Sequence, residues 1–568
     1  MNRRLHTILL AAIGGFVEAL ALPLAVPLLS LHELDPAGHL QWLAWVGLVP
    51  VLFALDRAAT WKQAFWIGTL AGFCFGYLAI HWISHAMTSF GEIPWAAALL
   101  ALTLLVLFMA VHWGAALAVS WVIRARLGWP WWRHLPLVWA GFELLRNYLF
   151  TGFPWGNLGY TQSRHLPIAQ LASLFGIYAI AALVVLVNCA IHAIWTARRD
   201  GQRFPVRLTA GVLLAVLAVA GYGAGRLAWL RTQMASAPKL KVGLIQANLD
   251  QSIKNEHDLN AEVILRRQIP LTVEADRAGA DLIAWPEAAY PYLVSPFMTT
   301  FAGGLAKLPT LHRAHLLLGA ATLRWIPGRG DKKVPEVTNA AFLVSPELVV
   351  LGKYTKHHLV PFGEYIPLSG LLPFLAQVVP DLAPTTPGQE LVPLRFPVQT
   401  GDPARRETRI APMICFDALF PEINVTYAHD DPELLVNPTN DAWYGYSSGP
   451  YQFLEIVRMR AIEAGKAMAR PAYAGVTALI LPTGELAPGT IGLGPVDPEH
   501  HPQPDHGPKL LLGDVPRLRG WTPYTRFGDL FAYASALYGA AALALALGKR
   551  KDAANASPEP PAEAASGT

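Results

Sequence analysis

Three residues in the second half of the sequence have side chains that together could perform thiol catalysis. They stand in the short phrases Trp285-Pro286-Glu287, Tyr354-Thr355-Lys356 and Ile414-Cys415-Phe416-Asp417. A cysteine nucleophile needs a base that takes its proton and a positive group that stabilises the oxyanion formed when sulfur attacks a carbonyl. Glu287 and Lys356 are of the types that supply those two parts. The three phrases therefore predict covalent catalysis through Cys415.

Several residues near these phrases are candidates for supporting roles. The oxyanion should also meet a backbone N–H, most simply that of Phe416, and Asp417 is a polar neighbour of the nucleophile. Glu364 would be a second carboxylate at the site that orients Lys356 or an incoming amine, and its alternative role is an ion pair on a loop. Trp443 and Tyr444, with Tyr365, are candidates for lining a substrate pocket, although ordinary packing explains such aromatic residues equally well.

The cysteine count sets Cys415 apart from the other thiols. The chain has three cysteines, of which Cys74 and Cys189 lie in long apolar runs and are expected to be small packing residues. The sequence contains no disulfide framework and no pattern of metal ligands. We expect neither a metal nor a cofactor, and a lone reactive thiol at Cys415.

The composition is that of a membrane protein. Hydrophobic residues make up 53% of the 568 residues and charged residues only 15%, far from soluble averages. The formal net charge of +4 is too small to suggest a nucleic-acid partner, and no basic tract with interleaved aromatic residues appears outside the loops that flank apolar segments. A polytopic membrane protein is predicted, and nucleic-acid binding is excluded.

Eight apolar stretches are candidates for transmembrane helices. They are residues 7–31, 39–55, 62–83, 92–122, 131–150, 167–196, 207–227 and 530–547. Lys and Arg gather in alternate loops and at both ends, which places both termini in the cytoplasm and the long polar block on the opposite side. The competing interpretation of the first stretch is a cleaved signal peptide, which Glu18 disfavours and which leaves the remaining orientation unchanged.

The resulting organisation has four parts. Residues 1–230 form a membrane domain with seven transmembrane helices, residues 239–520 a catalytic domain, residues 529–548 a last transmembrane helix, and residues 552–568 a disordered tail rich in Pro, Glu and Ala. Within the polar block, short apolar runs predict strands at Leu240–Gln246, Leu282–Trp285, Leu316–Gly319, Ala341–Val344, Val349–Gly352, Ile410–Cys415, Leu434–Asn437 and Thr477–Leu481. Helices are expected at Asn260–Ala278 and Gln452–Met468. This alternation predicts an α/β layered domain with catalytic residues at strand ends.

The order Glu, Lys, Cys on strand ends resembles the nitrilase, or carbon–nitrogen hydrolase, superfamily. Longer phrases resemble the bacterial apolipoprotein N-acyltransferases: residues 354–367 (YTKHHLVPFGEYIP), 440–445 (NDAWYG), 152–155 (GFPW) and 522–528 (TPYTRFG). The resemblance implies an αββα sandwich on a helical bundle of the bacterial inner membrane, with the sandwich in the periplasm. It also implies a Glu287-Lys356-Cys415 triad that moves the sn-1 acyl chain of a phospholipid, through a Cys415 thioester, to the α-amino group of the N-terminal diacylglyceryl-cysteine of apolipoproteins.

The sequence departs from the family pattern near the site. The family usually has Cys-Tyr-Glu where Cys415-Phe416-Asp417 stands, a His where Phe453 stands, and Thr-Asn-Asn-Gly where Ala472-Tyr473-Ala474-Gly475 stands. We expect these changes to lie where substrates contact the domain and to affect the range of acceptors. Two alternatives to the acyltransferase are a membrane-tethered amidase or hydrolase of nitrilase type, and a non-catalytic lipid-binding scaffold.

Overall fold

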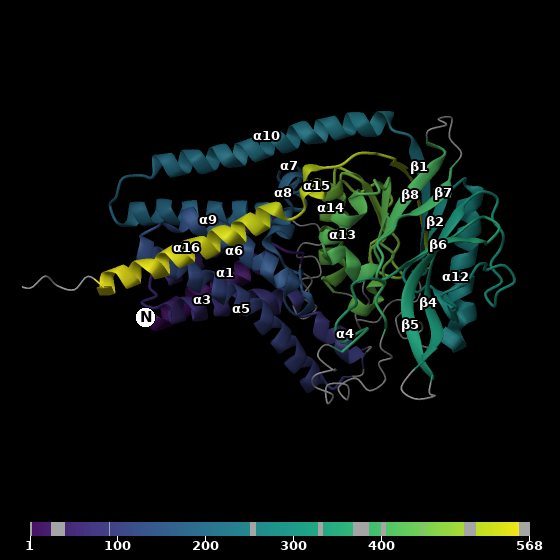
Figure 1. Ribbon diagram of the computed structural model, residues 1–568, viewed down its shortest axis with the longest axis horizontal. Helices are drawn as coiled ribbons and strands as arrows, with labels where there is room; N and C mark the ends of the chain where they lie inside the picture. The colour runs from purple at the N-terminus through teal and green to yellow at the C-terminus, as the bar shows by residue number, and fades with distance from the viewer. Residues whose placement is uncertain are drawn as a thin grey trace, which may run out of the picture.

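The computed structural model shows a bundle of helices joined to an α/β domain (Figure 1). It describes residues 3–23, 40–89, 91, 93–249, 257–327, 333–366, 385–398, 405–445, 447–492 and 507–555. The bundle occupies one half of the molecule and the two β-sheets the other (Figure 1). The long helix α10 runs along the bundle and leads into β1, and the C-terminal helix α16 lies across the bundle (Figure 1).

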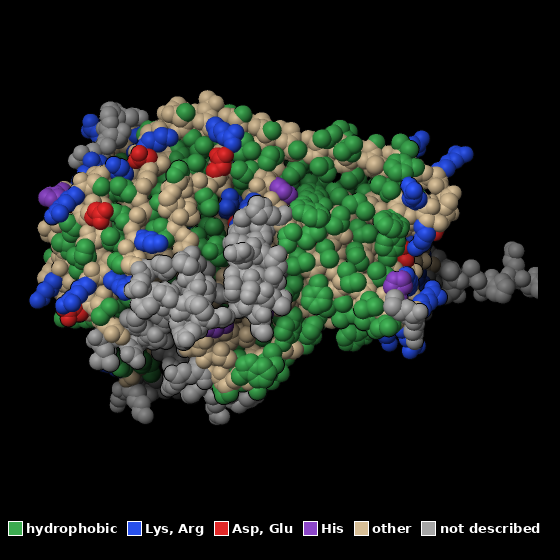
Figure 2. Space-filling view, turned by 180° about the vertical axis from the view of Figure 1, so that it is seen from behind, with side chains coloured by type: hydrophobic (Ala, Val, Ile, Leu, Met, Phe, Trp, Pro, Cys, Tyr) green, Lys and Arg blue, Asp and Glu red, His purple; other side chains and the backbone are tan. Residues whose placement is uncertain are grey.

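The helical half contains most of the apolar sequence. Its α-helices are α1 Arg3–Leu20, α2 Leu48–Leu55, α3 Trp61–Ile80, α4 Ile83–Ser89, α5 Trp95–Leu127, α6 Trp131–Tyr148, α7 Leu166–Ala169, α8 Ala172–Phe175, α9 Ile177–Arg199, α10 Val206–Ser236 and α16 Leu530–Asn555. Short 3-10 helices are η3 Gln41–Trp45, η4 Leu149–Thr151 and η5 Leu158–Gln162. Hydrophobic side chains cover much of the outer face of this half, with Lys and Arg at its far end (Figure 2).

Five helices in the described part of the chain are long and apolar enough to cross a membrane. They are α3, α5, α9, α10 and the Leu530–Lys549 portion of α16, which correspond to the third, fourth, sixth, seventh and eighth predicted stretches. The fifth stretch forms α6, which contains Pro136, Glu143 and Arg146, and the second is divided between η3 and α2. The first stretch forms α1 as far as Leu20, and its residues 24–31 lie outside the described part. Eight spans therefore remain a prediction.

Close packing of α3 against α5 depends on glycine. A Cβ atom on Gly68 would lie 2.9 Å from the Cα atom of Gly114, and one on Gly72 would lie 2.9 Å from the Cα atom of Ala110. Real Cβ atoms do not approach other atoms so closely, so the two backbones can meet only where side chains are absent. Small residues at helix crossings are the usual means of association in membranes, where lipid provides no hydrophobic drive between helices.

The α/β half is a sandwich of two sheets. The first has the strand order β12-β1-β2-β4-β5-β6 with β3 beside β4, and the second has the order β11-β10-β9-β8-β7. The strands are β1 Lys239–Gln246, β2 Leu282–Ala284, β3 Tyr290–Val294, β4 His315–Pro327, β5 Lys333–Val344, β6 Val350–Thr355, β7 Leu394–Pro397, β8 Glu407–Pro412, β9 Leu434–Val436, β10 Ala467–Arg470, β11 Ala478–Ile480 and β12 Lys509–Pro516. Helix α12 (His257–Arg277) packs on the first sheet, whereas α13 (Glu422–Ala428) and α14 (Gly449–Ala464) lie on the side of the second sheet. This is the predicted α/β sandwich.

All eight predicted strands have counterparts, although several boundaries differ, and β3, β7, β10 and β12 were not predicted. The strand expected at Ile410–Cys415 ends at Pro412, so that Cys415 opens the 3-10 helix η8 (Cys415–Leu419) instead of closing the strand. The helix expected at Gln452–Met468 ends at Ala464, because Gly465 takes a left-handed conformation with φ of 63° and caps the helix. Residues 467 and 468 belong to β10. Helix α16 continues to Asn555, which includes residues 552–555 of the predicted tail, and residues 556–568 lie outside the described part.

Helix α14 joins the two halves. Every residue of α14 except Tyr451 is buried. The amide oxygen of Gln452 accepts from the indole nitrogens of Trp155 at 2.7 Å and Trp82 at 3.3 Å, and its amide nitrogen donates to the carbonyl oxygens of Pro23 and Ala79. One helical turn later, the carboxylate of Glu455 accepts from Ser163 and Arg164, both at 2.6 Å. The sandwich is thereby held on the bundle by buried polar contacts.

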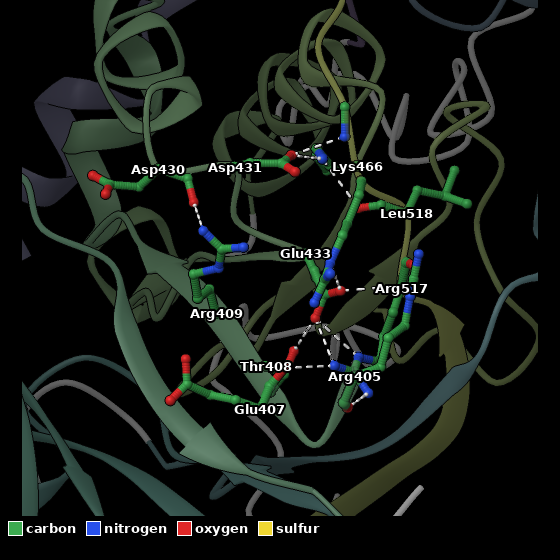
Figure 3. Close-up of polar contacts among 12 residues, drawn as sticks. Arg405, Glu407, Thr408, Arg409, Asp430, Asp431, Glu433, Lys466, Arg517 and Leu518 are labelled. Atoms are coloured by element: carbon green, nitrogen blue, oxygen red, sulfur yellow. Dashed lines mark hydrogen bonds and ion pairs between the residues drawn. The ribbon is translucent and has the colours of Figure 1, made fainter. Parts of the chain in front are cut away.

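A buried carboxylate anchors the segment that leads into α16. Glu433 has no exposed side-chain surface and accepts from Arg517 Nη2 at 2.7 Å, Arg519 Nε at 2.7 Å and Thr408 Oγ1 at 2.9 Å. Arg405 adds a longer ion pair of 3.6 Å. Figure 3 shows Arg405 and Arg517 approaching the same carboxylate from either side. Removal of the Glu433 carboxylate, or of the arginines that bind it, would leave an uncompensated buried charge. This cluster therefore fixes where the chain returns to the bundle.

Candidate active site

The three proposed catalytic residues follow the ends of strands from both sheets. Glu287 comes three residues after β2, Lys356 directly follows β6, and Cys415 comes three residues after β8. All three side chains lie inside the protein, with exposed fractions of 7% for Glu287, 1% for Lys356 and 5% for Cys415. A buried group with a polar function needs partners, and the partners of these residues define the site.

Lys356 lies between two carboxylates. Its Nζ atom is 2.9 Å from Oε1 of Glu287 and 2.9 Å from Oε2 of Glu364. Burial alone would lower the pKa of Lys356, but the charges of Glu287 and Glu364 outweigh burial and hold this pKa well above its usual value. The lysine is therefore a fixed positive charge at neutral pH. Glu364, predicted as a supporting residue, is in direct contact with it.

Asn339 completes this arrangement and was not identified from the sequence. Its Nδ2 atom donates to Oε1 of Glu287 at 2.8 Å and to Oε1 of Glu364 at 3.3 Å, while its backbone carbonyl accepts from the N–H of Lys356 at 2.8 Å. One β5 residue therefore orients both carboxylates and the lysine. Its signal in the sequence is an amide side chain between Thr338 and Ala340 of β5, which is too common to assign a role.

Cys415 stands on a sharp turn. Its φ of 47° is unusual for a residue with a side chain, and its N–H donates to the carbonyl of Pro438 at 2.8 Å. Burial raises the pKa of the thiol to about 12, with Glu287 adding to the increase and Lys356 opposing it. The resting sulfur is thus protonated at neutral pH, and attack on a carbonyl requires a base to remove the proton as the bond forms.

Asp417 ties the nucleophile turn to the lysine segment. Its Oδ2 atom accepts from the Tyr354 hydroxyl at 2.7 Å and from the N–H of Ile414 at 2.9 Å. Its Oδ1 atom accepts from the N–H groups of His357 and His358 at 3.2 and 2.6 Å. Because these donors flank Lys356 on one side and Cys415 on the other, Asp417 links the lysine segment to the nucleophile turn. It has no exposed surface, so its role is structural support.

The backbone N–H of Phe416 is suited to the oxyanion. The N–H of the next residue, Asp417, donates to the carbonyl of Ile414, whereas no acceptor within the described part of the chain takes the Phe416 N–H. The Phe416 ring packs edge to face on Phe420 with centroids 5.4 Å apart. A free donor directly after the nucleophile, opposite the Lys356 ammonium, can stabilise negative charge on a substrate oxygen.

Of the three aromatic candidates for substrate contact, Tyr444 lies where the two halves meet. Its ring is 4.8 Å from that of Trp82 and 6.1 Å from that of Trp155, both in the helical half. Burial is the main cause that raises the Tyr444 pKa, and a negative charge on Cys415 would add to the increase. Trp443 is 37% exposed, and Tyr365 lies in the loop that carries Glu364.

Several of the departures from the family pattern are buried. Phe453, Ala472 and Tyr473 have no exposed surface, and the Phe453 ring lies 5.7 Å from that of Trp155 and 6.4 Å from that of Tyr444. That these positions lie where substrates contact the domain stays a prediction. The ring of Phe453 lies 4.9 Å from the guanidinium of Arg470, and a Cβ atom on Gly475 would lie 2.4 Å from that of Asp441. Phe453 and Gly475 therefore pack against the buried pair of Asp441 and Arg470.

A cavity of about 680 Å³ lies elsewhere in the sandwich and is not the site of this chemistry. It is lined by charged and polar residues, among them Asp281, His312, Arg313, His315, Glu347 and Arg406. Asp281 precedes β2, whereas Glu287 follows it, so the cavity opens at the opposite edge of the sheet. Among the described residues, no group of three His, Cys, Asp or Glu side chains is placed to hold a metal ion.

Comparison with known proteins finds a matching family model for each half of the chain. Residues 22–190 match the family model of the apolipoprotein N-acyltransferase N-terminal domain, and residues 241–493 match that of the carbon-nitrogen hydrolases. The apolipoprotein N-acyltransferase of Geobacter metallireducens is 33% identical over 91% of this chain and 93% of its own length. The chain belongs to the apolipoprotein N-acyltransferase family. The apolipoprotein N-acyltransferases of Azotobacter vinelandii (32% identity, 94% of this chain and 96% of the relative) and Caulobacter vibrioides (30%, 92% and 91%) extend the match. The family resemblance predicted from the phrases is confirmed.

Proposed function

We propose that this chain is an N-acyltransferase of lipoprotein maturation. In this reaction the acyl chain of a phospholipid moves to the α-amino group of the N-terminal diacylglyceryl-cysteine of an apolipoprotein. The observation that carries the proposal is the arrangement of Lys356 between Glu287 and Glu364 beside Cys415, in a domain held on an apolar bundle. Membership in the family gives the acyltransferase class. The two lipid substrates, the sn-1 position and the triad are the finer parts of the proposal.

In the first half-reaction, Glu287 takes the proton of the Cys415 thiol as the sulfur attacks the ester carbonyl. The oxyanion receives hydrogen bonds from Lys356 and the Phe416 N–H. Collapse of this intermediate breaks the ester C–O bond, and the leaving lysophospholipid oxygen takes the proton back from Glu287. The product is a thioester on Cys415, which keeps the carbonyl reactive until the second substrate arrives.

In the second half-reaction, the α-amine of the acceptor attacks the thioester and Glu287 takes its proton. Collapse breaks the C–S bond, and the sulfur recovers a proton. Lys356 remains charged throughout, because its two carboxylate neighbours hold its pKa far above neutrality. Both substrates are anchored in the membrane by acyl chains. Because the thioester holds the acyl group between the two half-reactions, the substrates need not occupy the site together, which favours a ping-pong order.

The proposal includes an orientation. Basic residues near the ends of the apolar stretches place both termini in the cytoplasm of a bacterium and the sandwich in the periplasm, on the outer side of the inner membrane. The amines of exported lipoproteins would be accessible there. Labelling of cysteines introduced at exposed positions of the sandwich with a membrane-impermeant reagent tests this part independently of catalysis.

The decisive experiment separates the acyltransferase from its two alternatives. Purified enzyme incubated with labelled phospholipid should acquire a hydroxylamine-sensitive acyl group on Cys415, and a diacylated lipopeptide should convert it to N-acyl product. Release of free fatty acid without N-acyl product would indicate the hydrolase, and absence of label would indicate the scaffold. We expect Cys415→Ser to form no product and Lys356→Ala to slow acylation by about 100-fold or more. Undiminished acylation in either variant contradicts the assignment.

A further inference from the structure

The side chain of Asn339 bridges the two carboxylates of the site. An amide group has two N–H donors, and those of Asn339 go to Oε1 of Glu287 at 2.8 Å and to Oε1 of Glu364 at 3.3 Å. The backbone of Asn339 is held as well, because its carbonyl accepts from the N–H of Lys356 at 2.8 Å and β5 pairs with both β4 and β6. The donors of this amide are therefore fixed by the sheet.

The orientation of the Asn339 amide follows from these neighbours. A rotation by 180° would place the amide oxygen against the two carboxylates, where both sides are acceptors and no hydrogen bond can form. In the observed orientation the oxygen Oδ1 is buried and has no hydrogen-bond partner within the described part of the chain. A buried acceptor without a partner lowers stability. The fold accepts this loss while it keeps both donors on the carboxylates.

Oxygen Oε1 of Glu287 is saturated with donors. It accepts from Nζ of Lys356 at 2.9 Å in addition to Nδ2 of Asn339 at 2.8 Å. A carboxylate oxygen has two lone pairs, so Oε1 has no position left for a proton. The ammonium of Lys356 also lies 2.9 Å from Oε2 of Glu364. The two carboxylates use two of its three N–H groups, and the third remains for a substrate oxygen.

We propose that Asn339 is a positioning residue for the general base: with Lys356 it occupies Oε1 of Glu287, so that Oε2 takes the proton of the Cys415 thiol and later that of the amine. Oε2 returns the proton to the leaving lysophospholipid oxygen in the first half-reaction and to the sulfur in the second. The hydrogen bond from Asn339 also favours the charged form of Glu287, which a base must have. This role rests on the function proposed above, since it takes Glu287 as the base and Cys415 as the nucleophile.

The pH dependence of acyl-enzyme formation in the full chain tests this role. Asn339→Leu keeps the size of the side chain and removes both donors. Because loss of a donor favours the protonated form of a carboxylate, the acid limb of the profile should move upward by about one pH unit. Acylation of Cys415 should then be about 10-fold slower on the acid side. At alkaline pH Glu287 is charged in both proteins, so the rate should return close to that of the parent.

The matched control is Thr338→Val in the same strand. This change removes the hydrogen bond of 2.6 Å between the hydroxyls of Thr338 and Thr322 and leaves the donors of both carboxylates in place, so the pH profile should not move. Asn339→Ala takes the place of Asn339→Leu if that variant does not fold, and the unfolding temperature of each variant reports structural damage separately.

Infrared titration of the Glu287 carboxyl group gives a measurement without substrate. The band is identified by its loss in Glu287→Gln, and its midpoint should also move upward by about one pH unit in Asn339→Leu. An unmoved midpoint, or a slower rate at every pH with an unshifted profile, overturns the proposal. Faster acylation at every pH also overturns it, because Oε1 would then be the acceptor that Asn339 blocks. A parent that forms no acyl-enzyme contradicts the proposed function, and the infrared midpoint still decides whether Asn339 controls the charge of Glu287.

Discussion

Replacing Asp417 by Asn tests whether this carboxylate holds the site together. Asn has the same shape but only one accepting oxygen. If that oxygen stays with the N–H groups of His357 and His358, the new amide nitrogen faces the Tyr354 hydroxyl and the N–H of Ile414. The hydroxyl can rotate and accept, but the Ile414 N–H cannot and loses its partner.

The magnitude follows from these contacts. A buried N–H without a partner costs about 1–3 kcal/mol, and the bonds that remain lose about half their strength because the acceptor is no longer charged. Loss of the charge acts in the opposite direction, since burial raises the pKa of Asp417 despite its four donors. We expect a net loss of about 2 kcal/mol of folding stability, equivalent to a fall of about 2–3 °C in the unfolding temperature of a chain of this size.

Thermal unfolding in detergent measures this loss, and the rate of acyl-enzyme formation measures its effect on the site. Acylation should fall by more than about 10-fold, because a displacement of even 1 Å between Lys356 and Cys415 affects oxyanion stabilisation. The matched control is Glu262→Gln, which changes an exposed pair with Arg266 and should alter stability by less than about 0.5 kcal/mol. Parent-like unfolding and acylation in Asp417→Asn would refute the reasoning.

Three other outcomes can be checked in the same preparation. Gly475→Ala should lower the stability of the fold by about 3 kcal/mol or more, because the new Cβ atom would overlap Asp441. Gly279 has a similar positive φ but open space around it, so Gly279→Ala should cost only about 1 kcal/mol. Equal unfolding temperatures of the two variants would contradict this prediction. Gln452→Ala leaves two indole N–H groups and two carbonyls without their amide partner and should cost about 2–4 kcal/mol by thermal unfolding. Because the pKa of Cys415 is raised to about 12, its thiolate fraction should rise about tenfold per pH unit between about pH 7 and 10, so an alkylation rate that levels off near pH 8 would show that the thiol is not buried as described.

The sequence predicted the parts of the site that depend on residue type and strand ends. Glu287, Lys356 and Cys415 were identified because each follows a short apolar run, and the structure brings Glu287 and Lys356 into contact as expected. Their catalytic roles remain proposals. Asn339 could not be identified, because a single amide in a strand has no periodic signal and its partners come from distant segments.

Other features depend on tertiary packing, which a local sequence pattern does not predict. The run at residues 131–150 was one of the two weakest predicted spans, and α6 buries Glu143 and Arg146. Glu143 accepts from Trp139 of the same helix and from the N–H of Leu158, while Arg146 donates to Asn157. The substituted positions Phe453, Ala472 and Tyr473 were expected where substrates contact the domain, and this stays a prediction. All three are buried, Phe453 within α14 and the other two in the segment that follows β10.

The burial of α14 has a consequence for how such proteins can be recombined. Its contacts with Trp155 and Arg164 cross the boundary between the two matched family models. A chimera that takes its bundle from one relative and its sandwich from another must take residues 152–164 from the same source as the sandwich. Otherwise the amide of Gln452 and the carboxylate of Glu455 would lose their hydrogen-bond partners in that segment. Substitutions in one half are therefore constrained by the other, and the two halves can be exchanged between relatives only together.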